Sequence, residues 1–263
     1  MQAKELSSDG DSPRLQGKVA LVSDIGSAHG VAMVRRFVKA GALVAACPAG
    51  GEHRTGPAAA LTEVPPEVVL LEGDVCAPGV AQRIVDAVAD RFGRLDILVN
   101  HGAGGRFLGT ILDVSREDFD AAITGDVWSV IALSAAAIPL MTRSGGGSII
   151  NITTIGRRGL DGRPLRATGG GALSALTVSM ALDHGAAGIR VNALVLGPTQ
   201  AVEPPTDPEE LRALMSQFGG RTALGTMHTA EDVAAAALFL ASDEARRITG
   251  ARLTLDAGRS LSF

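Results

Sequence analysis

Tyrosine is missing from this 263-residue chain, which also has only one tryptophan and two cysteines. The absence of tyrosine excludes a phenol as a proton donor or acceptor. Cys47 and Cys76 are too few for a disulfide framework, and we expect both to be small buried apolar residues. No His-x-x-x-His or paired-cysteine spacing occurs, so the sequence predicts no metal site.

An excess of basic residues is missing as well. The net charge is −4 and the isoelectric point is about 5.7, which argues against a nucleic-acid partner or a polybasic membrane surface. No run approaches about eighteen uninterrupted apolar residues, and residues 1–14 lack the apolar region of a signal peptide. We therefore expect a cytoplasmic protein with a disordered tail at 1–14, one domain at 15–263, and no membrane association.

Hydrophobic residues make up 46% of the chain, and short β-rich runs alternate with longer helical ones. This alternation is typical of a parallel sheet covered on both faces. The sequence predicts a single-domain, doubly wound α/β fold of about seven strands. The expected strands are 19–23, 43–46, 68–72, 97–99, 148–152, 191–195 and 253–255, and the expected helices are 31–40, 80–92, 116–141, 172–187 and 231–240.

Several segments carry the motifs of a known family in collinear order. They are Leu-Gln-Gly-Lys-Val-Ala-Leu-Val at 15–22, Asp74-Val75, Leu-Asp-Ile-Leu-Val-Asn at 95–100, Arg190-Val191-Asn192, and Ile248-Thr249-Gly250 with Asp256. Over about nine-tenths of its length the chain resembles the short-chain dehydrogenase/reductase (SDR) family, whose members reduce carbonyls or oxidise alcohols with NAD(P). The resemblance implies a Rossmann-like fold, with Gly30, Asp74 and Asn100 as the nucleotide-binding residues if a nucleotide binds.

The positions that carry the family's chemistry differ here. In the family a strand Ser is followed thirteen residues later by Tyr, and Lys follows four residues after that. Counted from Thr154, these positions hold Ala167 and Gly171. The turn at 23–30 keeps Gly30 but places Asp24 close to the expected pyrophosphate. Repulsion between a carboxylate and a phosphate about 4 Å apart weakens nucleotide binding by up to ~4 kcal/mol at an effective dielectric of ~20. These changes predict that no cofactor binds, with NAD(P) as the alternative.

Other polar residues fall at the carboxyl ends of the strands, where ligands bind in such folds. His29, His101, Asp126 and Thr154 are the candidate catalytic residues, because imidazole and carboxylate pairs exchange protons near neutral pH. The alternative is that they are solvated remnants of an older site. A charged loop over this site offers arginines for an anionic substrate group; its charged residues are Arg157, Arg158, Asp161, Arg163 and Arg166.

Three further segments have an expected role. Gly169, Gly170 and Gly171 add backbone freedom, so we expect a loop before the helix at 172–187 that is either flexible or open to the close approach of a bulky substrate. The proline-rich 203–208 and the short run 209–218 correspond to the family's lid over the substrate pocket. The helices at 116–141 and 172–187 are largely apolar and correspond to the family's interface, which predicts a homodimer or homotetramer.

Three functions follow as hypotheses. The first is redox-neutral acid–base catalysis on a small organic substrate, such as cyclisation, dehydration, isomerisation or lyase cleavage. The second is a non-catalytic partner that pairs with an active SDR paralogue in a mixed oligomer. The third is an NAD(P)-dependent oxidoreductase with an unusual proton donor. The lost Tyr and Lys positions favour the first hypothesis over the third.

Overall fold

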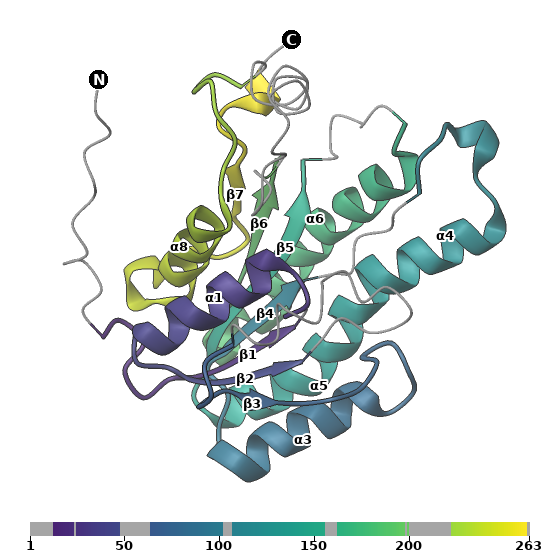
Figure 1. Ribbon diagram of the computed structural model, residues 1–263. Coiled ribbons are helices and arrows are strands. Elements are labelled where there is room, and N and C mark those ends of the chain that lie inside the picture. The colour runs from purple at the N-terminus through teal and green to yellow at the C-terminus, as the bar shows by residue number, and fades with distance from the viewer. Residues whose placement is uncertain are drawn as a thin grey trace.

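The protein folds around a seven-stranded sheet in which every pairing is parallel (Figure 1). The computed structural model describes residues 13–23, 25–47, 64–101, 107–155, 162–197, 199 and 222–261. The strand order is β3-β2-β1-β4-β5-β6-β7, which confirms a single-domain, Rossmann-like doubly wound fold. The strands are β1 (Val19–Ser23), β2 (Leu43–Cys47), β3 (Val69–Leu70), β4 (Ile97–His101), β5 (Gly147–Thr154), β6 (Ile189–Leu196) and β7 (Arg252–Leu255).

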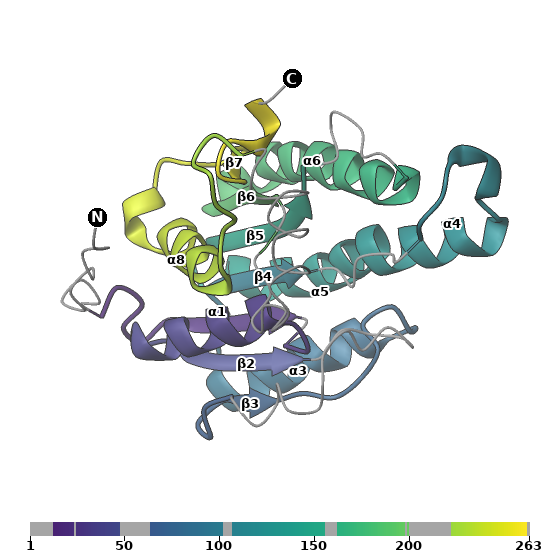
Figure 2. The ribbon, with the colours of Figure 1, turned by 45° about the horizontal axis from the view of Figure 1, so that its top comes forward.

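Helices cover both faces of this sheet (Figure 2). On one face α1 and α8 pack against the strands and each other, with Phe37 and Val233 fully buried. On the other face α3, α5 and α6 bury Ile84, Leu133 and Met180. The helices are α1 (Ala28–Lys39), α3 (Val80–Phe92), α4 (Arg116–Ile123), α5 (Ser129–Arg143), α6 (Pro164–His184) and α8 (Ala230–Ala241), with short 3-10 turns at Ile111–Asp113, Gly185–Ala187, Asp243–Ala245 and Arg259–Leu261.

The central strands are buried along their whole length. β1 reads Val-Ala-Leu-Val-Ser with every residue buried, and β6 has one partly exposed residue in eight. A strand with helices on both faces needs apolar side chains at every position rather than at alternate ones. This is why the sequence predicts the sheet as continuous apolar runs.

Polar side chains fix where several helices begin. The Ser27 hydroxyl accepts a hydrogen bond from the Gly30 N–H at 3.1 Å and so caps α1 beside the end of β1. Thr229 and Asp232 form a reciprocal capping box at the start of α8. Such caps satisfy N–H groups that the helix itself cannot pair. The start of α1 thereby gains a defined position at the carboxyl edge of the sheet.

The helix expected at 116–141 has a break in its middle. After α4 the chain makes a π-helical turn, Thr124–Trp128, before α5 begins. The turn places Asp126 inward, where it is 7% exposed. A π turn inserts an extra residue into a helix and is frequent at functional sites.

The expectation of a flexible loop at Gly169–Gly171 is wrong, because α6 already begins at Pro164. The three glycines lie inside the helix, and Gly169 and Gly170 are buried. A Cβ on Gly169 would stand 3.0 Å from Asp126 Oδ2, and one on Gly170 would stand 3.1 Å from Thr154 Cγ2. The missing side chains allow α6 to approach the π turn and β5, and tertiary packing outweighs the low helix propensity of glycine.

The span Arg116–Arg143 is long and apolar enough to cross a membrane by length and composition alone, with a mean hydropathy of 1.6 over a window that is 39% buried. The same composition suits a helix that covers a parallel sheet. Leu133 and Ala137 of α5 pack into the core beneath β4 and β5. Apolar residues of this span therefore cover the sheet.

Several predictions fall outside the described residues. They concern Asp24, the loop residues Arg157, Arg158 and Asp161, the lid at 203–218, and the tail up to residue 12. Arg14, at the end of the expected tail, forms an ion pair with Glu244.

Candidate active site

The carboxyl ends of β1, β4, β5 and β6 meet at one edge of the sheet. His101 is the last residue of β4 and Thr154 the last residue of β5. The strand order reverses direction between β1 and β4, which is where ligands bind in doubly wound sheets. The start of α1, with His29 in its first turn, lies beside this point.

Three imidazoles gather at this edge. The His29 and His101 rings are 5.7 Å apart and nearly perpendicular, and the His29 and His228 rings are 6.3 Å apart and stacked. The Thr199 hydroxyl connects two of them, at 3.1 Å from His29 Nε2 and 2.8 Å from His228 Nε2. We call His29, Thr199 and His228 the histidine–threonine chain.

Burial keeps the histidine–threonine chain uncharged. Desolvation, together with the smaller electrostatic effects of His101, His228 and Arg166, lowers the pKa of His29 to about 3. Desolvation also lowers the pKa of His228, which is 4% exposed, while Asp232 and Asp256 partly oppose this shift. Both imidazoles are therefore neutral at neutral pH.

The buried Nδ1 of His228 indicates how the protons are arranged. This atom has no hydrogen-bond partner among the described residues. An unpaired N–H costs more than an unpaired lone pair, so the proton belongs on Nε2. His228 Nε2–H then donates to Thr199, the Thr199 hydroxyl donates to His29 Nε2, and the His29 proton stands on Nδ1.

The His101 backbone is held by a serine side chain of the first strand. Its N–H donates to Ser23 Oγ at 2.8 Å, and its Nδ1 lies 3.4 Å from the Ser27 hydroxyl that caps α1. His101 is partly exposed at the edge of the sheet. It is therefore open to a ligand while its position is fixed by two neighbouring elements.

Thr154 and Asp126 meet α6 at its two buried glycines. The Thr154 hydroxyl donates to the Leu196 carbonyl at 3.4 Å, and its methyl group lies beside Gly170. The Asp126 carboxylate lies beside Gly169. Desolvation lowers the pKa of Arg166, and the negative charge of Asp126 raises it. Arginine stays protonated in either case, so Arg166 brings a permanent positive charge close to Asp126.

The predicted nucleotide-binding residues lie in three places. Gly30 is in the first turn of α1. Asp74 follows β3, and its carboxylate accepts the Cys76 N–H at 2.8 Å. Asn100 is 1% exposed and donates to Ser134 Oγ at 3.0 Å and Asn151 Oδ1 at 2.9 Å, which ties β4 to α5 and β5.

The predicted catalytic residues form two groups. His29 and His101 lie together at the edge of β1 and β4, whereas Asp126 and Thr154 each lie beside a buried glycine of α6. Sequence reasoning missed Thr199 and His228. The one available signal for His228 is its place immediately before the capping box at Thr229, which indicates a helix start at a strand edge.

Neither cysteine forms a disulfide. Cys47 is buried at the end of β2, and desolvation together with Asp74 raises the pKa of the Cys76 thiol to about 11. In the described part of the chain, His, Cys, Asp and Glu form no group of three or more that could hold a metal ion.

Known proteins share this architecture over nearly the whole chain. A family profile described as Enoyl-(Acyl carrier protein) reductase matches residues 26–260. An uncharacterized oxidoreductase of Thermotoga maritima is 35% identical and covers 92% of this chain and 97% of its own. Meso-2,3-butanediol dehydrogenase of Serratia marcescens is 32% identical and covers 95% of this chain and 97% of its own.

Solved structures agree with these sequence matches. A short-chain dehydrogenase/reductase mutant from Serratia marcescens superposes with a TM-score of 0.81 at 32% identity, covering 94% of this chain and 99% of the other. A putative short-chain dehydrogenase/reductase from Burkholderia xenovorans gives 0.84 at 28% identity, covering 95% and 99%. The chain belongs to the short-chain dehydrogenase/reductase family.

These findings correct the first two functional hypotheses. The expectation of redox-neutral catalysis without a cofactor is wrong, as is that of a non-catalytic partner subunit, because the relatives are dehydrogenases and oxidoreductases matched along more than nine-tenths of the chain. Both expectations rested on substitutions at a few positions. The similarity instead points to NAD(P)-dependent redox chemistry.

Proposed function

We propose that the chain is an NAD(P)-dependent oxidoreductase that interconverts a small alcohol and its carbonyl compound, with a proton donor other than tyrosine. The observation that carries this proposal is the full-length similarity to the butanediol dehydrogenase. The departure from the family lies in Ala167 and Gly171 and in the absence of tyrosine. The protein therefore needs another group to exchange the substrate proton.

The chain offers a fitting place for the nucleotide. The turn after β1 leads into α1, whose first turn lies beside the point where strand order reverses. A helix start of this kind stabilises a pyrophosphate, and Gly30 adds no bulk there. Asp74, after β3, is available on the adenine side of the same edge. When bound, the nicotinamide supplies or accepts the hydride.

His101 is the residue we assign to proton exchange. His29 stays neutral because burial and its charged neighbours oppose protonation, so the proton-bearing role falls to the partly exposed imidazole beside it. Histidine exchanges protons near neutral pH without help from a metal. His101 would give a proton to the substrate oxygen in reduction and take it back in oxidation.

The remaining polar groups would orient the substrate. Thr154 ends β5, and among the described residues its hydroxyl has a single long bond, to Leu196, to exchange for a substrate oxygen. The histidine–threonine chain presents a neutral N–H at His29, since Thr199 holds the other ring nitrogen. Asp126 and Arg166 form the charged wall of the site. A fixed, uncharged donor next to His101 polarises a carbonyl without competing for the proton.

An assay with purified protein tests this function. A mixture of short vicinal diols and hydroxyketones is offered with each nucleotide, and the change in NADH or NADPH absorbance is followed. The proposal expects nucleotide-dependent turnover that His101→Gln lowers and that His184→Gln, a surface histidine at the end of α6, leaves unchanged. Saturable nucleotide binding with no turnover on any hydroxyl or carbonyl substrate would contradict it.

We also propose that the protein is a cytoplasmic homo-oligomer. Apolar side chains remain exposed on the outer face of α6 and at the start of α5, notably Val178, Leu182 and Trp128 at 43%, 79% and 49%. Exposed apolar groups of this size on neighbouring helices are typical of subunit contacts. A second copy of the chain is the simplest partner for them.

A further inference from the structure

A second cavity lies at the opposite edge of the sheet from the candidate active site. It has a volume of about 530 Å³ and is formed where β4, β5 and β6 begin, at Ile97, Gly147 and Ile189. The active-site residues stand where these strands end. Along β5, the distance from Gly147 to Thr154 is roughly 23 Å at about 3.3 Å per residue. The two sites are therefore separate.

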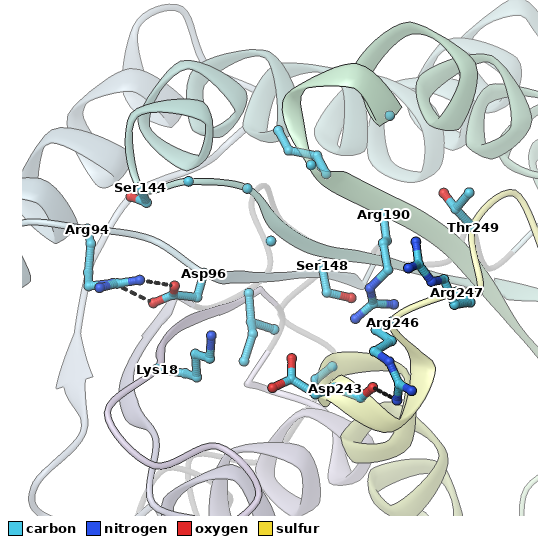
Figure 3. A pocket seen from close by; sticks show the side chains of 18 residues that line it. Lys18, Arg94, Asp96, Ser144, Ser148, Arg190, Asp243, Arg246, Arg247 and Thr249 are labelled. Carbon is cyan, nitrogen blue, oxygen red and sulfur yellow. Dashed lines mark hydrogen bonds and ion pairs between the residues drawn. The ribbon is translucent and has the colours of Figure 1, made fainter.

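Positive charge dominates the walls of this cavity. Five cationic side chains line it against two carboxylates, in a chain whose overall net charge is −4. Figure 3 shows Arg190, Arg246 and Arg247 gathered at one side. The cationic residues are Lys18, Arg94, Arg190, Arg246 and Arg247, and the acidic ones are Asp96 and Asp243.

Part of this charge is already neutralised. Arg94 forms a two-pronged pair with Asp96, from Nε to Oδ2 at 2.9 Å and from Nη2 to Oδ1 at 2.6 Å. Asp96 is 5% exposed and also accepts the Val19 N–H at 2.9 Å, which ties it to the start of β1. Arg94 and Asp96 therefore serve the fold, and their charges cancel.

Of the remaining cations, Lys18 and Arg247 are uncompensated among the described residues, whereas Arg190 is held by backbone carbonyls, including that of Ile248 at 3.4 Å. Neither the Lys18 ammonium nor the Arg247 guanidinium has a hydrogen bond or ion pair with the rest of the described chain. Arg190 donates to the carbonyls of Leu240 at 2.8 Å and Ser242 at 3.3 Å, at the end of α8. Burial lowers the pKa of Arg190, and Asp243 opposes this shift. The cavity thus holds more positive charge than its carboxylates balance.

Glycines open the space between these cations. A Cβ on Gly146 would collide with the Gly188 carbonyl, and one on Gly147 with the Asp96 carbonyl, so the backbone segments pack directly together at these points. A Cβ on Gly145 or Gly185 would meet nothing within 4 Å. The glycines leave room for a ligand of a few heavy atoms beside the arginine cluster.

We propose that this cavity binds a compact multivalent anion of the phosphate class, such as a phosphate ester or a short polyphosphate, through Lys18, Arg190 and Arg247. Guanidinium groups match phosphate oxygens in pairs, and an ammonium adds a point charge. A singly charged anion would leave much of the positive charge uncompensated. The site lies at the far edge of the sheet and is independent of the proposed redox reaction.

Isothermal titration with inorganic pyrophosphate at constant ionic strength tests this site. We expect one saturable site in the wild-type protein. Lys18→Gln combined with Arg247→Gln removes two charged donors, and each such loss weakens binding about ten- to a hundredfold. Arg83→Gln combined with Arg91→Gln is the matched control, since this pair removes an equal charge from the exposed side of α3, outside the cavity.

A second variant keeps the test valid if the double variant fails to fold. Gly185 has a helical φ of −58° and open space beside its Cα, so Gly185→Glu brings a carboxylate to the cavity without backbone strain. It should abolish binding, whereas Gly185→Ala should retain it. The titration is repeated with saturating NADH to occupy the start of α1. The proposal would be overturned if the wild-type protein did not bind pyrophosphate. It would also be overturned if saturating NADH abolished pyrophosphate binding while the cavity variants still bound it.

Discussion

His101 and His29 stand 5.7 Å apart and differ in what their surroundings allow. Burial and three neighbouring cationic or titratable groups hold His29 neutral, whereas His101 sits at the partly open end of β4. Two adjacent imidazoles cannot both be protonated without mutual repulsion. This repulsion and the burial of His29 favour the proposed roles, in which His29 is a neutral hydrogen-bond donor and His101 exchanges the proton.

His101→Gln should lower kcat by about 10²–10⁴, because a positioned general acid or base contributes a factor of this size. Steady-state rates with a saturating nucleotide measure the effect. Nucleotide affinity should stay unchanged, since the imidazole is not assigned to the cofactor. Equal kcat values for His101→Gln and the control His184→Gln would remove His101 from the mechanism.

Stability should fall on acidification because of His29. Its pKa is lower in the folded state than the ordinary value of 6.5, so the unfolded chain binds more protons as the pH drops from 6.5 toward 3. The contribution of neutral His29 to the free energy of unfolding is fully present above pH 6.5. By pH 5 the free energy of unfolding has fallen by ~2 kcal/mol. His228 shifts in the same direction and adds to the loss.

Thermal denaturation between pH 7 and 5 measures this slope. His29→Gln keeps a hydrogen-bonding group near Thr199 and removes the titration, so its melting temperature should fall less steeply than that of the wild type. His184→Gln should keep the wild-type slope. Parallel curves for all three proteins would show that His29 is not protonated on unfolding in this range.

At the scale of elements, α6 depends on glycine at two of three consecutive positions. Gly169→Ala places a methyl group 3.0 Å from Asp126 Oδ2, and overpacking of this kind costs about 1–3 kcal/mol. Gly171→Ala is the matched control, because its Cβ would meet nothing within 4 Å. Alanine there should stabilise the helix by about 0.5–1 kcal/mol.

Urea denaturation of both variants compares these effects. The free energy of unfolding should fall in Gly169→Ala and rise in Gly171→Ala. Two stabilising substitutions would mean that α6 does not press on the π turn. Activity should also fall in Gly169→Ala alone, since Asp126 would be displaced.

The elements themselves were largely predictable. Continuous apolar runs gave β1 at 19–23 and amphipathic spacing gave α3 at 80–92, both with the observed bounds. The start of α6 and the π turn at Thr124–Trp128 were not predictable, because both depend on how α6 meets Asp126 and Thr154 in space. Local propensity alone assigns Gly169–Gly171 to a loop.

The site was predictable only in part. Strand ends point to His101 and Thr154, since the carboxyl ends of parallel strands share one edge. The histidine–threonine chain joins residues 29, 199 and 228, and no spacing along the sequence connects them. The prediction of redox-neutral catalysis was wrong because it depended on single positions such as Ala167 and Gly171, whereas the dehydrogenase relatives match along the whole chain.

At the scale of the whole molecule, the exposed apolar face of α6 should hold subunits together. Leu182→Lys places a charge on a side chain that is 79% exposed in one subunit and buried in the expected oligomer. Light scattering after gel filtration should show a smaller assembly. Leu112→Lys, at a side chain that is 91% exposed outside α5 and α6, is the control and should leave the assembly intact. A monomeric wild-type protein would contradict the prediction.

Nucleotide binding decides whether the protein is an NAD(P)-dependent oxidoreductase. Titration of the wild-type protein with NADH and with NADPH, followed by melting temperature and by the fluorescence of Trp128 at the end of the π turn, should give a saturable response to at least one of them. A ligand at a hundred times its dissociation constant stabilises by ~2.7 kcal/mol, which is a visible shift in melting temperature. No response to either nucleotide at saturating concentration would contradict the assignment as an NAD(P)-dependent oxidoreductase.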